Sequence, residues 1–162
     1  MDVDFDPSLF GPAVAAVLSP LPLMPLGPGK PNADLRPALQ AIDLPPACRA
    51  GLWLVHDFQT ESHDIAQDLH TAEGSYWHAI QHRREPDAGN AKYWLRRIGV
   101  HPIHADLKLA ATEAGYANWS PERFVDDCER HRDTGTPTEA LLRQVQMLEW
   151  RLLFHWCCER GM

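Results

Sequence analysis

The sequence predicts an all-α fold, an irregular helical bundle of about five to six helices that follows an extended proline-rich N-terminal arm. Three observations lead to this prediction. Apolar residues recur at helical spacing over most of the chain after residue 45. Capping residues, prolines and glycines mark starts and stops between these stretches. Runs that alternate apolar and polar residues, as half-buried strands do, are absent from the sequence.

Proline divides the chain into an arm at 1–44 and a helical domain at 45–162. Ten of the fourteen prolines lie within residues 1–46, where they remove backbone donors and restrict the residues before them. The run at 19–31 also carries apolar side chains, which disordered tails usually lack, namely Leu21, Leu23, Met24 and Leu26. We therefore expect an extended arm that lies on the body of the protein or docks on a second copy, with a candidate short helix at 33–43. A loose tail is the alternative.

Three helices are expected in the first part of the domain, at 45–69, 75–84 and 88–98. The first of them is expected to be one long helix because its apolar residues approximate a helical stripe, namely Leu52, Val55, Phe58 and Ile65. A break at Gly74 separates it from the second helix. Asp87 is the expected N-cap of the third helix, and Gly99 stands where a C-terminal glycine would end it.

Three more helices are expected in the second part, at 102–114, 121–132 and 137–159. Gly115 ends the first of these. Ser120 followed by Pro121 is a start signal, with a cap and then proline at the first helical position. Thr136 and Glu139 have the spacing of a capping box at the start of the last helix.

Charge and cysteine usage exclude several classes of protein. The sequence has 22 acidic and 15 basic side chains, a net charge of -7 with neutral histidines. Nucleic acids and anionic membranes attract basic proteins, so we expect neither as a partner. No apolar run reaches the length of a membrane span, and the acidic N-terminus differs from a secretory signal. The four cysteines form no CxxC pair, so we expect reduced thiols in a cytoplasmic protein.

Histidines are frequent, nine in 162 residues, and some of them are spaced to meet. His78 and His82 are four residues apart and share one helix face, which Glu85 extends. If the helices at 45–69 and 75–84 pack antiparallel, His63 or His56 completes the group. Imidazoles with a carboxylate bind divalent metals such as zinc, iron or manganese. The predicted metal ligands are His63, His78, His82 and Glu85, and the predicted catalytic residues are His78, His82 and Glu85.

The same histidines have a structural alternative. A pair four residues apart arises easily by chance in a chain with this many histidines. Ala79 follows His78, so the HExxH motif of metalloproteases is absent, and the Glu-x-x-His pairs of di-iron bundles are missing as well. In this alternative the histidines are hydrogen-bonded residues between helices.

Four arginines lie close in the sequence to two carboxylates, with Arg83, Arg84, Arg96 and Arg97 beside Glu85 and Asp87. Arginine pairs well with carboxylates, so we expect a network that ties the turn at Pro86 to both neighbouring helices. The functional alternative is an anion pocket in which Arg83 or Arg97 binds a substrate carboxylate or phosphate. Asn90 and Tyr93 carry polar groups in the same segment and are the other predicted ligand-binding residues.

The stretch YWHAIQHRREPDAGNAKYWLRRIGVHP at 76–102, preceded by ESHDIAQ at 61–67, resembles an uncharacterised family of small helical proteins from bacteria and fungi. The resemblance covers about a quarter of the chain. Gln81 stands where the family has methionine. The resemblance implies a small all-helical protein and no particular activity. The matching positions are His63, Ile65 and Gln67, then Tyr76, Trp77, His78, Ile80, His82, Arg83 and Glu85, then Asn90, Tyr93, Trp94 and Arg96.

Two hypotheses for function follow. In the first, the histidine segment forms a polar pocket that binds a divalent metal or a small anionic molecule, as in a hydrolase or lyase, with histidine as metal ligand or as general acid and base. In the second, the protein is a non-enzymatic interaction module that forms a homodimer through its proline-rich arm. The sequence supports no nucleotide cofactor, because it contains neither a Walker loop nor GxGxxG.

Overall fold

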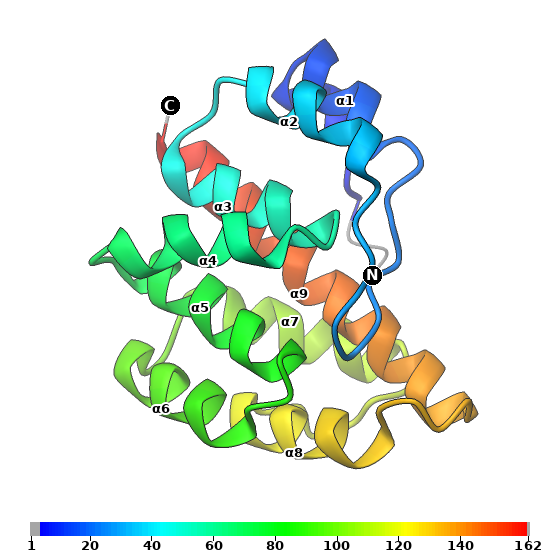
Figure 1. Ribbon diagram of the computed structural model, residues 1–162. Helices are drawn as coiled ribbons and strands as arrows, with labels where there is room; N and C mark the ends of the chain where they lie inside the picture. Colours follow the sequence, from blue (N-terminus) through cyan, green and yellow to red (C-terminus); the bar gives the residue numbers. More distant parts are fainter. Residues whose placement is uncertain (1–3, 162) are drawn as a thin grey trace.

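The computed structural model describes residues 4–161, and within that range the chain contains helices and no strand. The prediction of an all-α fold is confirmed (Figure 1). Residues 1–3 of the predicted arm and residue 162 of the predicted domain lie outside the described residues. The elements within the described range are η1 (Pro7–Phe10), α1 (Pro12–Leu18), η2 (Ala33–Leu35), α2 (Arg36–Ala41), α3 (Pro46–Val55), α4 (Gln59–Asp68), α5 (Ala72–Arg84), α6 (Ala88–Ile98), α7 (Ile103–Glu113), α8 (Pro121–His131) and α9 (Pro137–Gly161).

The number of helices exceeds the five to six predicted, partly because the long helix expected at 45–69 is broken. Helices α3 and α4 are separated at residues 56–58, where Asp57 has a left-handed backbone with φ 63°. Aspartate tolerates this conformation better than most residues other than glycine. The prediction of one helix is wrong because neither proline nor glycine marks this break.

The arm contains more helix than expected, since α1 and α2 both lie within residues 1–44. Pro12 stands at the first position of α1, where its missing N–H costs nothing. Residues 19–32 form the extended part, and helix α2 ends at Ala41, close to the end of the short helix expected at 33–43.

Most other helix ends agree with their start and stop signals. Helix α6 has the predicted bounds, and the Asp87 side chain accepts a hydrogen bond from the Asn90 N–H at 3.1 Å. Helix α5 starts earlier than predicted, because Thr71 caps it by accepting a hydrogen bond from the Gly74 N–H at 3.1 Å. Gly74 is therefore inside the helix, where a Cβ atom would lie 2.4 Å from the Cβ atom of Leu69. This glycine allows the turn between α4 and α5 to pack tightly.

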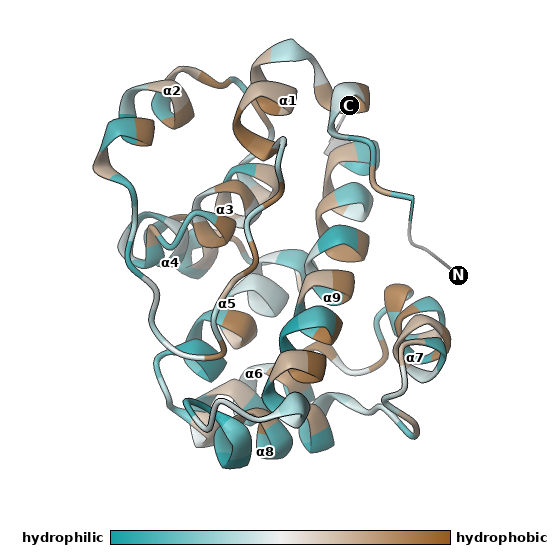
Figure 2. Cartoon of the chain, turned by 90° about the vertical axis from the view of Figure 1, so that its right-hand side faces the viewer, coloured by the Kyte–Doolittle hydropathy of each residue, from teal (hydrophilic) through white to brown (hydrophobic). Residues whose placement is uncertain are grey.

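The core forms where α9 crosses α3, α5, α7 and α8 (Figure 1). Trp150 of α9 is fully buried, stacks on Phe154 with 4.7 Å between ring centroids, and donates a hydrogen bond to the Gly51 carbonyl at 2.8 Å. In Figure 2, α1 and α3 are largely hydrophobic, whereas α8 is mostly hydrophilic along its outer side. The four cysteines are buried free thiols, as expected. No helix within residues 4–161 is both long and apolar enough to cross a membrane.

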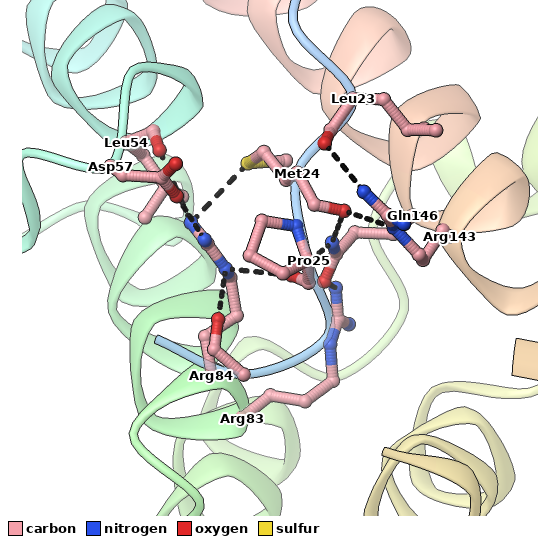
Figure 3. Close-up of polar contacts among 10 residues, drawn as sticks. Leu23, Met24, Pro25, Leu54, Asp57, Arg83, Arg84, Arg143 and Gln146 are labelled. Atoms are coloured by element: carbon pink, nitrogen blue, oxygen red, sulfur yellow. Dashed lines mark hydrogen bonds and ion pairs between the residues drawn. The ribbon is translucent and has the colours of Figure 1, made fainter. Parts of the chain in front are cut away.

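The extended part of the arm lies on the body of the protein (Figure 3). The Arg143 side chain of α9 donates to the carbonyl oxygens of Leu23 and Met24, and Gln146 donates to that of Pro25. Met24 and Leu26 are buried in the core. Backbone carbonyls that a sheet or helix would satisfy are thus satisfied here by side chains from α9. Docking of the arm on a second copy stays a prediction.

Two buried arginines of α5 connect distant parts of the chain. Arg84 is fully buried, donates to the carbonyls of Pro25, Gly27 and Leu54, and forms an ion pair with Asp57. It therefore joins the arm, the break between α3 and α4, and α5 in one network (Figure 3).

The predicted pairing of the arginines with Glu85 and Asp87 is wrong. Arg83 is paired with Glu149 of α9 at 2.6 Å, and Arg96 with Glu122 of α8 at 2.8 Å. Arg83 points into the core and Arg96 faces the neighbouring helix α8. Their carboxylate partners therefore come from helices that are distant in the sequence.

Candidate metal centre

Three histidines converge between α4 and α5, which form an antiparallel pair joined by the short turn at residues 69–71. One ring nitrogen from each of His63, His78 and His82 lies within 4.8 Å of the other two. The Nε2 atoms of His63 and His78 are 3.0 Å apart. The four-residue spacing on α5 places His78 and His82 on one helix face, and the antiparallel packing of α4 against α5 places His63 opposite them.

The rings approach one another from different directions. His78 and His82 stack on the same face of α5, with 4.6 Å between centroids and 26° between planes. The His63 ring of α4 is nearly perpendicular to both, at 85° and 86°. Three nitrogens can therefore point toward one region without their rings overlapping.

The spacing of the nitrogens suits a small divalent cation. Zinc–nitrogen bonds of about 2.0–2.1 Å in a tetrahedral site place neighbouring ligand nitrogens about 3.3 Å apart. The 3.0 Å between His63 and His78 is close to that value, and the 4.8 Å limit on the full set requires only small shifts of rings. Three protein ligands leave one of the four positions of a tetrahedral site open.

The site lies at the edge of the core, and burial keeps one imidazole neutral. His78 and His82 are buried, whereas His63 is half-buried. Burial, followed by the nearby rings of His82 and His63, lowers the pKa of His78 to about 4, against the opposing charge of Glu85. A neutral imidazole is the form that binds metals, so no proton has to leave His78 first.

Glu85 contacts a histidine instead of joining the three convergent nitrogens. Its Oε2 atom is 2.9 Å from His82 Nδ1, and its Oε1 accepts a hydrogen bond from Gln81 at 3.1 Å. The Asn90 amide lies 3.3 Å from the same Nδ1 atom. Glu85 was predicted as a metal ligand, and its carboxylate lies against His82 Nδ1, outside the group of three convergent nitrogens.

The other predicted ligand-binding residues separate into two groups. Arg83 is buried beneath the site, where its guanidinium lies 4.6 Å from the centre of the Phe124 ring and pairs with Glu149. It faces away from solvent, so it has no access to a soluble anion. Arg97 and Tyr93 are exposed on α6, and Arg97 donates a hydrogen bond to the Tyr93 hydroxyl at 3.1 Å. Only this second pair can meet a ligand from solution.

Trp94 is part of the site, although it was not among the predicted site residues. Its ring stacks on His78 with 4.3 Å between centroids and 30° between planes. The sequence contains a matching spacing. Trp94 follows Asn90 by four residues, and His78 precedes His82 by four residues. An antiparallel α5–α6 pair that brings Asn90 to His82 also brings Trp94 to His78.

A groove of about 440 Å³ opens beside the histidines, between α4, α5 and α6. Polar and aromatic side chains share its lining with aliphatic ones, and the residues are Ala66, Gln67, Leu69, His70, Thr71, Ala72, Ser75, Trp94, Arg97 and Ile98. Trp94 belongs both to the groove and to the histidine cluster, so the two features are adjacent.

Comparisons of the chain with protein-family models, with curated proteins and with solved structures gave no match. The resemblance to a family of small helical proteins therefore stays a prediction. Inferences about function rest on the geometry of the site itself.

Proposed function

We propose that the protein binds a divalent metal ion through His63, His78 and His82 and uses it in hydrolase- or lyase-type chemistry on a small anionic molecule. One observation carries the proposal, namely the convergence of three histidine nitrogens within 4.8 Å. Buried polar atoms normally have partners, and three imidazoles facing one another at the edge of a core have few partners that suit them all. A cation satisfies the three nitrogens together.

The donor set favours zinc, with iron or manganese as the other candidates. Imidazole suits zinc and the later transition metals, whereas calcium and magnesium prefer oxygen ligands. Three histidine ligands with an open fourth position resemble catalytic zinc sites more than structural ones, which use four protein ligands. A metal in such a site polarises a carbonyl or activates a water molecule.

The residues of the chain have distinct tasks in this proposal. His63, His78 and His82 hold the ion, so they are unavailable as general acid or base. Glu85 accepts the Nδ1–H of His82 and fixes the tautomer that presents Nε2. Its side chain is 37% exposed, so its carboxylate also reaches the solvent edge of the site, where a proton can be accepted or released.

Elemental analysis of purified, untagged protein tests the proposal. We expect about one zinc, iron or manganese ion per chain, and its loss in a His78→Ala/His82→Ala variant. A His131→Ala/His155→Ala variant is the matched control, because those histidines lie on α8 and α9 outside the group. Absence of metal from the wild type after incubation with all three ions, or equal metal in both double variants, would contradict the proposal.

Self-association through the arm is the second candidate function. It has less support, because Met24 and Leu26 are buried within the same chain. Leu23 is 51% exposed and lines an apolar groove of about 500 Å³ between the arm, α7 and α9. A dimer in light scattering that a Leu23→Ser change converts to a monomer would favour this function. A cytoplasmic location, predicted from the reduced cysteines, belongs to the proposal for either function.

A further inference from the structure

We propose that the groove between α4, α5 and α6 binds a small organic carboxylate, with Arg97 holding the carboxylate and Trp94 supporting the body of the molecule. This inference rests on the proposed function, because it names the substrate class of the same metal site. It follows from the order of residues along three packed helices, from the lining of the groove and from the charge of Arg97.

The groove lies one helical turn from the histidines on both α4 and α5. His63 of α4 is opposite His78 of α5. Because the two helices run antiparallel, the next turn places Ala66 opposite Ser75, and both line the groove. One turn of an α-helix rises about 5.4 Å. The groove therefore begins about one turn from the metal-binding nitrogens, toward the turn that joins α4 to α5.

Helix α6 follows the same order. Asn90 contacts His82, and Trp94, four residues later, stacks on His78 four residues earlier. Continuing by three residues in each direction brings Arg97 beside Ser75, and both are part of the groove lining. The three helices thus form a trough in which the histidines occupy one level and Arg97 the next.

The groove has the size and lining of a small-molecule site. Its volume of about 440 Å³ falls within the range of about 300–1,000 Å³ that ligand pockets span. Gln67, Thr71 and Ser75 provide neutral hydrogen-bonding groups, while Trp94 and Ile98 provide an apolar surface. This mixture suits a ligand with an apolar part and one or two polar ends.

Arg97 supplies a positive charge at one end of the groove. Within the described residues it forms no ion pair, whereas its neighbour Arg96 is paired with Glu122. The Arg97 guanidinium lies 5.3 Å from the centre of the Trp94 ring and 5.7 Å from that of Tyr93, and one of its N–H groups binds the Tyr93 hydroxyl. Two aromatic rings therefore position the guanidinium, and most of its five donors stay free for a ligand.

A single arginine favours a carboxylate over a phosphate dianion. The guanidinium fork matches the two oxygens of a carboxylate in a bidentate pair. The other polar groups of the lining, apart from His70, are neutral, so a second negative charge would have little compensation. Because Arg97 and the histidines are about one helical turn apart, about 5 Å, the ligand needs a second polar group a few bonds from its carboxylate. That second group would reach the metal.

A titration with N-acetylglycine tests the inference, because this molecule has a carboxylate and an amide carbonyl a few bonds apart. The readout is the indole N–H resonance of Trp94 in nuclear magnetic resonance spectra, assigned with a Trp94→Phe variant. We expect saturable binding that weakens about tenfold or more in Arg97→Met. Arg96→Met is the matched control and should bind as the wild type does, and N-acetylglycinamide, which lacks the charge, should bind as weakly as the Arg97→Met variant binds N-acetylglycine.

Three results would overturn the inference, namely no binding to the wild type at millimolar concentration, equal affinity in Arg97→Met, or tighter binding of methyl phosphate than of N-acetylglycine. The titration is run without metal and then with zinc, which separates this inference from the proposed function. Zinc that binds while Arg97 has no effect on N-acetylglycine contradicts the carboxylate site alone. Carboxylate binding in a protein that takes up no zinc contradicts the metal centre alone.

Discussion

The Nε2 atoms of His63 and His78 lie 3.0 Å apart, although the two residues belong to different helices and are fifteen positions apart in the sequence. At this distance the two nitrogens either share one proton or both bind the same cation. The two cases differ in one respect that is simple to measure. A cation that binds only the folded protein stabilises it, and the stabilisation grows with concentration.

We therefore expect zinc to raise the melting temperature of the wild type and to leave that of His63→Ala unchanged. At a free zinc concentration one hundred times the dissociation constant, the stabilisation is about 2.7 kcal/mol. His155→Ala, on the outer part of α9, is the control and should respond as the wild type does. Equal zinc responses in His63→Ala and the wild type would contradict the proposed ligand.

Glu85 should control the affinity for the metal without binding it. Glu85→Gln removes the charge that accepts the His82 Nδ1–H, and changes of this kind lower metal affinity about 10- to 100-fold. Isothermal titration with zinc measures the effect, with the exposed Glu122→Gln as control. Complete loss of binding in Glu85→Gln would instead make Glu85 a direct ligand, as the sequence had suggested.

Asp57 should stabilise the docked arm, since it neutralises the buried Arg84. Asp57→Asn keeps a residue that tolerates the left-handed backbone and removes only the charge. We expect a loss of about 2 kcal/mol in the free energy of unfolding, the usual value for a hydrogen bond to a charged group. Glu122→Gln, at an exposed ion pair, should cost less than about 1 kcal/mol. Urea denaturation measures both, and similar losses would show that the Arg84 pair contributes little.

Two glycine-to-alanine changes should have opposite effects. A Cβ atom at Gly51 would lie 2.6 Å from the Trp77 ring, so Gly51→Ala should destabilise by about 1–3 kcal/mol through overpacking. At Gly89 the nearest atom to a new Cβ lies 3.8 Å away, and alanine there should stabilise by about 0.4–1 kcal/mol because it restricts the unfolded chain. Thermal denaturation of the two variants compares them directly. A stable Gly51→Ala would show that the Trp77 ring can move.

Stability should fall in mild acid, and His101 should contribute to the fall. Burial, together with the nearby His104 and Arg160, lowers the pKa of His101 to about 4, although Glu73 opposes this. The folded state therefore takes up the His101 proton at a lower pH than the unfolded state, whose pKa is about 6.5. The contribution is fully present above pH 6.5 and is lost as the pH falls toward 4, by at most about 1.4 kcal/mol per pH unit.

His101→Asn tests this dependence. In the wild type, His101 Nδ1 accepts a hydrogen bond from the Ile103 N–H at 3.4 Å. Asparagine keeps an acceptor near this N–H, and its side chain does not titrate. Urea denaturation midpoints should fall less steeply between pH 6.5 and 4 in the variant. At pH 8 the His101 imidazole is neutral in both the folded and the unfolded state. The difference in the free energy of unfolding between the two proteins at this pH therefore measures packing alone. Parallel pH profiles would assign the acid sensitivity to other groups.

Local rules predicted much of this fold and brought together the three histidines. Proline, glycine and capping residues predicted the bounds of α6, and the four-residue spacing placed His78 beside His82. These features depend on neighbours in the sequence. The break at Asp57 escaped prediction because neither proline nor glycine marks it, and the residue that pairs with Asp57, Arg84, is distant in the sequence.

The partners of the arginines escaped prediction for the same reason. Arg83 pairs with Glu149, a residue on the last helix, and proximity in the sequence pointed instead to Glu85. The spacing of Asn90 and Trp94 matches that of His78 and His82, but only the register of α5 against α6 places Trp94 on His78 and Arg97 one turn further along the groove. Long-range pairing depends on how helices pack, and helical periodicity alone leaves that packing undetermined.

The arm described above has a consequence for the order in which the chain acquires its structure during synthesis. Gly27 precedes its partner Arg84 by 57 residues, and Pro25 precedes Gln146 by 121. The arm leaves the ribosome long before α5 and α9 have been synthesised. Until then its apolar side chains are exposed to solvent or bound by another protein. The arm is made before the helices that bind it, so it is among the last segments to reach its final position, after α9 has been completed.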